Sequence, residues 1–390
     1  MEIAVVWPHN HPNFFLEGAQ LAVRDINRRG GIIIEDDQGN PVPARIVMRE
    51  YDEFQFRNVK KLAERIVSDP NLSAVIGHST PDSAILASIT YQDNGLLYLS
   101  PSVSDTRLTQ LGFWSTIRTI PTDAVISQAL VAFALKHGWH QAAILHVRDT
   151  YGTTYANLLR ASMGELYARG LRNTNEVSSM GLVFQEHYGT DELSFYPLIS
   201  TLLKRKFDVV FLGDSLIGDA APRTLALLAQ LREMGVTAPI LGTEEIHSRR
   251  LWPALGTKAN GIFAASVFDL QFDKSNRLAS QFRLEFRTTY TNLPTMQGSK
   301  AYEAVLLLAQ AAERARSKRP IKMATMFRST SHWDGLQGEG AYNFSPDGGI
   351  QGKNVILEQV KDGTFIRPEI PEVCAVYTNI VEQPMRNRRK

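Results

Sequence analysis

The sequence is poor in cysteine, in long apolar runs and in net charge, and each shortage excludes a class of protein. Cys374 is the single cysteine among 390 residues, so no disulfide can form within this chain. No stretch approaches the roughly 18 apolar residues that a membrane-spanning helix needs, so we predict no membrane insertion. Lysine and arginine number 42 against 40 aspartates and glutamates, and this balance does not favour binding to nucleic acid.

Motifs for cofactors and metals are also missing. The sequence contains no P-loop, no HExxH and no CxxC, and the isolated Gly338-x-Gly340 follows no clear strand, so we predict no cofactor. Two histidine pairs, His9 with His11 and His137 with His140, each lack a third ligand nearby in sequence. Because a zinc site needs at least three protein ligands, we predict no metal site.

One stretch resembles an enzyme motif. Residues 209–219, VVFLGDSLIGD, are similar to the nucleophile block of GDSL esterases, in which the serine, here Ser215, would attack an ester. That family also needs an Asp-x-x-His to supply the base, and this sequence contains none. We therefore expect a protein that is not an enzyme, and the esterase remains a remote alternative.

The stretch 73–104 contains two strands joined by a helix. Apolar runs at 73–78 and 96–100 favour strands, and small and aromatic residues at helical spacing favour a helix at 83–93. Such a unit places both strand ends at one edge of a parallel sheet, where ligands commonly bind. The loops at these ends contain Ser79, Thr80, Ser102 and Ser104, which either contact a ligand or cap the helices that follow.

Strands and helices alternate along most of the chain. The pattern runs through residues 1–120, is interrupted at 121–123, and then restarts, with residues 177–193 read as a loop. Near the end, residues 354–365 favour a β-hairpin around Lys361-Asp362-Gly363, which suggests that the chain returns to an earlier domain. The alternation predicts an α/β fold with two doubly wound parallel-sheet lobes.

Five stretches together resemble a known family. They are GAQLAVRDINRRGGI (18–32), VIGHSTPDSA (75–84), GLLYLSPSVSDTRLT (95–109), IRTIPTD (117–123) and DTYGTTY (149–155). In order and spacing they resemble type I periplasmic solute-binding proteins, and within that group the leucine/isoleucine/valine-binding receptors of ABC transporters. The resemblance implies two lobes joined by a three-segment hinge, with a ligand cleft between them.

The resemblance also implies which segments form each lobe. The N-terminal lobe would comprise residues 1–120 and 247–344, and the C-terminal lobe residues 121–246 and 345–390. The chain would cross near 119–122, 244–249 and 343–348. We expect the basic tail, residues 384–390, to be disordered.

By the same resemblance, hydroxyl groups would bind a ligand carboxylate. Matching positions are Ser102 and Ser104. A further serine of the family is replaced by Pro81, which has neither a hydroxyl nor an N–H, and Ser79 or Thr80 could take its place.

Acidic residues would face the ligand's ammonium group. The matching positions are Asp123 and Glu244, while Tyr151 would close over the ligand and Ser215 would occupy a cleft position. Asp123 could equally cap the helix that follows it, and Glu244 could be a surface acid.

The predicted function is that of an extracytoplasmic solute-binding receptor. It would bind an amino acid or a related small molecule, close its lobes, and deliver the ligand to a membrane permease of an ABC transporter. Pro81 and the short first loop, residues 8–14, leave another small anion, an amide or an aromatic acid open as ligands. The first strand follows Met1 directly, without a signal peptide, so we expect either a periplasmic protein whose export segment has been removed or a cytoplasmic sensor. A receptor ectodomain of the same fold is the other alternative.

Overall fold

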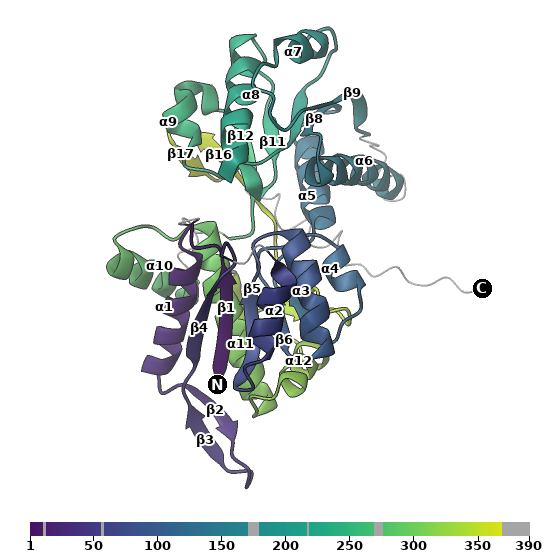
Figure 1. The fold of residues 1–390 in the computed structure, drawn as a ribbon. Helices are drawn as coiled ribbons and strands as arrows, with labels where there is room; N and C mark the ends of the chain where they lie inside the picture. The colour runs from purple at the N-terminus through teal and green to yellow at the C-terminus, as the bar shows by residue number, and fades with distance from the viewer. Residues whose placement is uncertain (11–12, 56–57, 171–178, 217, 269–275, 369–390) are drawn as a thin grey trace, which may run out of the picture. The chain divides into compact units, whose positions relative to one another are not determined.

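The chain divides into two compact units, each built from two separate segments (Figure 1). The computed structural model describes residues 1–10, 13–55, 58–170, 179–216, 218–268 and 276–368. Unit 1 comprises Met1–Thr122 and Phe268–Asn354, and unit 2 comprises Asp123–Val267 and Val355–Lys390. The chain therefore passes between the units three times, and the prediction of two α/β lobes is confirmed. The basic tail at 384–390 lies outside the described residues.

Two of the three connections come later than the sequence-based boundaries. Strand β12 (Ile262–Ser266) pairs with β11 (Ile240–Gly242), so the chain leaves unit 2 only after Val267 and not near 247. Strand β15 (Ile350–Gln351) pairs with β14 (Gly338–Phe344), which keeps the chain in unit 1 as far as Asn354. Strand pairing sets these boundaries, and pairing is not visible in the local composition.

Unit 1 is organised around a five-stranded parallel sheet. From edge to edge its strands are β4 (Val47–Asp52), β1 (Glu2–Trp7), β5 (Leu72–Gly77), β6 (Leu97–Ser100) and β7 (Thr116–Arg118). The chain proceeds from β1 to β4 on one side and then to β5 on the other side. The gap between the ends of β1 and β5 is therefore the topological switch point of this sheet. Two small antiparallel sheets complete the strands of unit 1; they are β2 (Ile32–Glu35) with β3 (Pro41–Ala44), and β13 (Trp333–Gly335) with β14 and β15.

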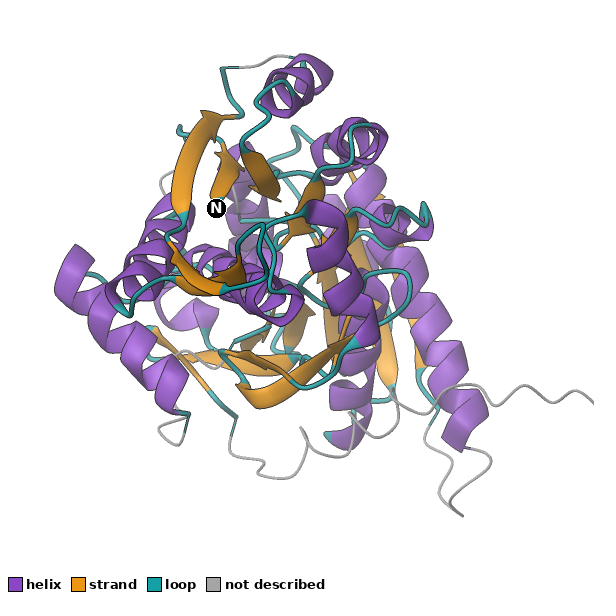
Figure 2. Ribbon diagram, turned by 90° about the horizontal axis from the view of Figure 1, so that it is seen from below, coloured by secondary structure: helices purple, strands orange, loops and turns teal. Residues whose placement is uncertain are grey.

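Helices cover the sheet of unit 1 (Figure 2). They are α1 (Phe15–Arg28), α2 (Val59–Val67), α3 (Pro81–Asp93), α4 (Arg107–Gln110), α10 (Arg277–Tyr290), α11 (Met296–Ala315) and α12 (Pro320–Ser329). Apolar residues of α2 and α3 pack against one face of β1 and β5 in a single buried cluster. Helices α1 and α11, from opposite ends of the chain, pack closely, since a Cβ atom at Gly18 would lie 2.0 Å from the carbonyl oxygen of Gly298. Only glycine permits that approach.

Unit 2 contains a seven-stranded sheet. From edge to edge its strands are β17 (Thr364–Ile366), β16 (Ile356–Lys361), β12, β11, β10 (Val209–Gly213), β8 (Gln141–Val147) and β9 (Gly181–Tyr188). The five strands from β12 to β9 are parallel, and their switch point lies between β8 and β10. Strands β16 and β17 form the predicted hairpin, turning at Asp362 and Gly363, both with positive φ, and they add antiparallel to β12.

Strand β9 corrects the prediction of a loop at 177–193. It pairs in parallel with β8 along its whole length, at the edge of the sheet. The strand carries Gln185, Glu186 and His187 in succession, and its side chains are mostly half-buried or exposed. An edge strand of this kind lacks the alternation of apolar and polar residues that identifies a strand in sequence.

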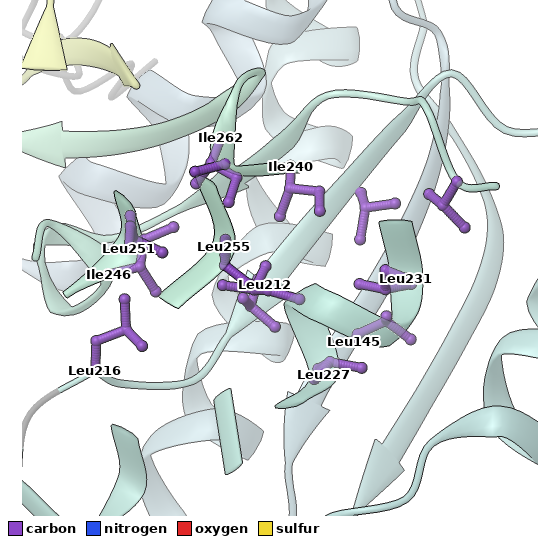
Figure 3. Packing of buried hydrophobic residues seen from close by; sticks show 14 of the residues in the cluster. Leu145, Leu212, Leu216, Leu227, Leu231, Ile240, Ile246, Leu251, Leu255 and Ile262 are labelled. Carbon is purple, nitrogen blue, oxygen red and sulfur yellow. The ribbon is translucent and has the colours of Figure 1, made fainter. Parts of the chain in front are cut away.

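Two apolar clusters form the core of unit 2, one on each face of the sheet. Val210 and Leu212 of β10 point into the cluster that contains residues of α7, α8 and α9, part of which Figure 3 shows. Val209 and Phe211 point into the opposite cluster, with residues of α5 and α6. The helices and short 3-10 turns of this unit are α5 (Asp123–Lys136), α6 (Thr150–Gly170), α7 (Tyr196–Leu202), η1 (Gly218–Ala220), α8 (Ala221–Glu233), η2 (Glu244–Ile246), α9 (Leu251–Leu255) and η3 (Gly256–Ala259).

A buried ion pair lies inside unit 1, next to the points where the chain leaves and enters it. Lys353 contacts Glu303, and each side chain is only 1% exposed. The Lys353 Nζ atom also donates to the carbonyl of Thr119 at 3.2 Å and lies 4.1 Å from the centre of the Phe268 ring. Thr119 precedes the first connection, Phe268 follows the second, and Lys353 precedes the third. One ammonium group therefore holds all three segments together, and Glu303 also accepts a hydrogen bond from Tyr342.

We expect Glu303→Ala to lower the free energy of unfolding by about 3–5 kcal/mol, because it removes the carboxylate beside a buried ammonium group. Urea denaturation measures the loss. The double variant Glu303→Leu/Lys353→Met should regain most of it, since neither charge is then buried. Glu2→Ala, which breaks the exposed Glu2–Arg49 pair, is the control and should have little effect. Equal losses in Glu303→Ala and Glu2→Ala would contradict the anchoring role.

Candidate functional site

In each unit the loops at the switch point of the sheet carry polar side chains. A doubly wound sheet opens a crevice there, outside the carboxyl ends of its strands, and ligands of such folds bind in it. In unit 1 these loops follow β1 and β5, and in unit 2 they follow β8 and β10. The candidate residues Ser79, Tyr151 and Ser215 all lie in or directly after these loops. The two sets are described separately.

The loop after β5 is held tightly against β1. Gly77 has φ of 135°, and a Cβ atom at this position would lie 2.0 Å from the carbonyl oxygen of Val6. The next residue, His78, also has a positive φ of 58° and donates its backbone N–H to the same carbonyl. A bulkier residue at position 77 would push the loop away from the sheet, so this glycine fixes where Ser79 lies.

Ser79 binds an acid within the protein. Its backbone N–H donates to Oε2 of Glu53 at 2.9 Å, and its hydroxyl donates to the same oxygen at 2.6 Å. Glu53 follows the end of β4 and is 8% exposed. Its other oxygen lies 2.8 Å from Nδ1 of His78, whose Nε2 atom lies 2.9 Å from the hydroxyl of Tyr91. The sequence analysis did not identify Glu53, which lies 26 residues before its serine partner.

The environment of Glu53 keeps it ionised. Burial alone would raise the pKa of this carboxyl group, but the hydrogen bond and charge of His78 and the two donors of Ser79 act in the opposite direction. Together they lower the pKa of Glu53 from 4.5 to about 2. At neutral pH Glu53 is therefore an ionised carboxylate that accepts both protons of Ser79 and contacts His78.

Thr80 caps a helix. Its hydroxyl oxygen accepts from the backbone N–H of Ser83 at 3.3 Å and donates to the Ser83 hydroxyl at 3.0 Å, and Pro81 opens α3. The structure thus gives Thr80 the capping role that the sequence left open. Thr80 and Ser79 both lie in the loop, but their hydroxyl protons already have acceptors in the protein.

The loop after β6 carries Ser102 and Ser104. Both are half-buried. The hydroxyl of Ser102 donates to the side-chain oxygen of Gln297 at 3.3 Å, in the first turn of α11. Gln297 was not predicted, because nothing in its local sequence indicates a contact with a loop nearly two hundred residues earlier.

In unit 2, Tyr151 lies near two acidic residues, Glu245 and Asp123. Helix α6 begins at Thr150, so Tyr151 lies in its first turn. The Tyr151 hydroxyl lies 2.6 Å from Oγ1 of Thr243. Burial raises the pKa of Tyr151 well above its usual value, and the nearby charges of Glu245 and Asp123 raise it further. Asp123 is the first residue of α5 and is 9% exposed. The phenol therefore stays protonated beside these acids.

Ser215 binds Glu245. Its hydroxyl donates to Oε2 of Glu245 at 2.7 Å, and its backbone carbonyl accepts from the Thr224 hydroxyl at 2.6 Å. This arrangement argues against the esterase, since the serine's proton is shared with a carboxylate that fixes its direction. The sequence analysis selected Glu244, and the acid beside Ser215 is its neighbour Glu245. Glu244 begins η2 and is half-buried.

A buried network supports the loop that carries Ser215. Arg223 of α8 binds Asp214 through two hydrogen bonds, Nε to Oδ2 at 3.1 Å and Nη2 to Oδ1 at 2.5 Å. The Tyr188 hydroxyl donates to the same carboxylate at 2.8 Å. Because paired guanidinium and carboxylate groups are rigid, this network fixes the backbone on either side of β10's end.

The structure shows no metal cluster in the part of the chain that it describes. No group of three or more His, Cys, Asp or Glu side chains there could hold an ion. His11 lies outside the described residues, and His137 donates from Nδ1 to the carbonyl oxygen of Phe133 and stacks on Trp139. Across the described ranges no helix is long and apolar enough to span a bilayer.

The chain resembles several known binding proteins. The profile of the periplasmic binding protein family matches residues 14–364. The Leu/Ile/Val-binding protein homolog 1 of Brucella abortus is 26% identical over 343 residues, which cover 86% of this chain and 83% of that protein. The leucine-, isoleucine-, valine-, threonine- and alanine-binding protein of Pseudomonas aeruginosa is 24% identical over 80% of this chain and 77% of its own length. An ABC transporter substrate-binding protein from Desulfitobacterium hafniense, solved in complex with Leu, has a TM-score of 0.77 at 26% identity and covers 94% of this chain and 99% of that one.

We expect Glu53→Gln to make the free energy of unfolding less dependent on pH in the acidic range. A carboxyl group with a lowered pKa in the folded state stabilises the protein above its ordinary pKa, and this contribution disappears as the pH falls from 4.5 to about 2. The contribution is on the order of 3 kcal/mol. Urea denaturation at about pH 5 and about pH 2 should show a smaller drop in unfolding free energy for Glu53→Gln than for the wild type.

The matched control for this experiment is Glu50→Gln. Glu50 lies on β4, is exposed, and accepts a hydrogen bond from Gln20 at the surface. This variant removes the same charge from an exposed position three residues earlier, so the pH dependence of its unfolding free energy should match that of the wild type. If the unfolding free energy of Glu53→Gln falls as much as that of the wild type between the two pH values, the loop is not what keeps the Glu53 carboxyl group ionised.

Proposed function

The chain belongs to the periplasmic binding protein family, and we propose that it is the extracytoplasmic receptor of an ABC transporter, binding an amino acid or a related small polar molecule such as an amide. Receptors of this kind do no chemistry on the ligand. Binding shifts the equilibrium between an open and a closed form, and the closed form is recognised by a membrane permease. We further propose that the protein acts in the periplasm.

The observation that carries this proposal is the polar character of the strand ends in both units. Unit 1 presents hydroxyl groups of Ser102 and Ser104 after β6, next to the switch point. Unit 2 presents the phenol of Tyr151 after β8 and Glu244 after β11, and Asp123, the first residue of α5, lies near Tyr151. An amino acid needs donors at one end and acceptors at the other, and the two units offer these separately.

Charge determines which end of the ligand each unit takes. Acidic residues of unit 2 would accept from the ligand's ammonium group, and the hydroxyl of Ser104 would donate to its carboxyl or carboxamide oxygen. Ser102 would join it by turning its hydroxyl proton away from Gln297. A charge-assisted hydrogen bond away from water contributes about 1.5–3 kcal/mol. The complex of the Desulfitobacterium hafniense relative with Leu, and the names of the Brucella and Pseudomonas relatives, support an amino acid or a close analogue as the ligand.

A thermal-shift screen against amino acids, amides and small carboxylates tests the receptor function. A ligand at about 100 times its dissociation constant stabilises the folded state by about 2.7 kcal/mol, which raises the melting temperature by several degrees. We expect a clear shift with an α-amino ligand. A protein that binds no member of the three classes, in the screen or by calorimetry, would contradict the proposal.

Glu244→Gln tests the acidic end of the site. If Glu244 accepts from the ligand's ammonium group, this variant should weaken binding of an α-amino ligand by about 1–3 kcal/mol in isothermal titration calorimetry, with little change in folding stability. Glu233→Gln is the control, because Glu233 pairs with Lys258 at the surface of α8 and should leave affinity unchanged. Equal affinity in Glu244→Gln and the wild type would remove Glu244 from the site.

A further inference from the structure

The β5 loop offers a ligand acceptors in place of donors. A serine has two protons to donate, one on its backbone nitrogen and one on its hydroxyl. In Ser79 both protons point at Glu53 Oε2, at 2.9 and 2.6 Å. The Ser79 hydroxyl oxygen can therefore only accept a further hydrogen bond, through its lone pairs. Thr80 also donates its hydroxyl proton within the protein, to Ser83.

A carboxylate of the protein already occupies the donors of this loop. Glu53 is ionised within hydrogen-bond distance of Ser79, and Asp82 adds a second acid in the first turn of α3. The positive end of a helix dipole normally attracts anions, but the carboxylate of Asp82 already interacts with that end of α3. A ligand carboxylate placed on Ser79 would therefore lie close to the Glu53 carboxylate and find neither proton of Ser79 free to donate.

The neighbouring strand end offers the complementary group. Trp7 ends β1, on the other side of the switch point, and its indole ring stacks on Phe15 with ring centres 3.8 Å apart. The Trp7 Nε1 atom is buried and makes no hydrogen bond to any residue that the structure describes. Buried indole N–H groups normally have an acceptor, so this one is available to an oxygen of a ligand.

We propose that Glu53 determines the specificity of the site by setting Ser79 as an acceptor, so that the ligand presents an uncharged hydrogen-bond donor, as a carboxamide does, at the β5 loop in place of a carboxylate. A carboxamide carries both an N–H donor for Ser79 and a carbonyl oxygen for the donors nearby. This inference rests on the proposed receptor function and narrows its ligand class to amides and similar neutral groups.

Matched pairs of ligands test this proposal. Calorimetry compares leucine with leucinamide, isoleucine with isoleucinamide, and valine with valinamide on the wild-type protein, on Glu53→Gln and on Ser79→Ala. We expect the wild type to bind at least one amide on the order of tenfold more tightly than its acid, because the acid meets the charge of Glu53. In Glu53→Gln this preference should fall on the order of tenfold, since the side-chain amide can donate and carries no charge.

Ser79→Ala keeps the proposal testable if Glu53→Gln fails to fold. This variant removes the acceptor, so it should weaken amide binding and leave the affinity for the acid nearly unchanged. Glu50→Gln, at the exposed position on β4, should keep the wild-type preference. Thermal unfolding of each variant separates a folding defect from a change in specificity.

The outcomes distinguish this proposal from the receptor function. Binding in which the wild type prefers the acid, or in which neither variant changes the ratio of amide to acid affinity, would overturn the role of Glu53 and leave the receptor function standing. A protein that binds no acid and no amide would overturn the receptor function, and this proposal with it.

Discussion

The ammonium group of Lys353 is the contact on which unit 1 depends most. Unit 1 is assembled from two segments of chain that 145 residues of unit 2 separate, Asp123–Val267. Lys353 contacts Glu303, Thr119 and Phe268, and so it joins the end of the first segment to both ends of the second. A buried charge tolerates little displacement, because each partner that moves away leaves an uncompensated ion. The three connections therefore start from fixed positions.

The loops after β5 and β10 share one hydrogen-bonding arrangement. In each unit a serine after a central strand donates its hydroxyl proton to a carboxylate, Ser79 to Glu53 and Ser215 to Glu245. In each case the acid fixes the orientation of the hydroxyl group. Further hydrogen bonds hold each loop. In unit 1 His78 contacts Tyr91, and in unit 2 Asp214 accepts from Arg223 and from the backbone N–H of Ser215. Pre-oriented groups of this kind lose little entropy when a ligand binds.

The sequence predicts the strand ends well and their partners poorly. Buried parallel strands such as β5 and β10 are continuous apolar runs, so the loops that follow them, with Ser79 and Ser215, can be located from the pattern alone. Glu53 and Glu245 reach those serines from the segments that follow other strands, 26 and 30 residues away, and only the pairing of the strands brings them together. The edge strand β9 and the later connections escape prediction for the same reason, because tertiary pairing defines them.

The packing of α1 on α11 has a consequence for how the chain acquires its fold during synthesis. The parallel strands and helices of unit 2 are complete once residue Ser266 has been made, whereas α1 must wait for α11, at Met296–Ala315, before its apolar side is covered. Contacts between such distant segments form slowly, and apolar surface left open in the meantime invites aggregation. Unit 1 therefore begins first but covers α1 only after the parallel part of unit 2 has been made, and Phe15, Ala19 and Ala22 are the residues that a chaperone would encounter on the nascent chain.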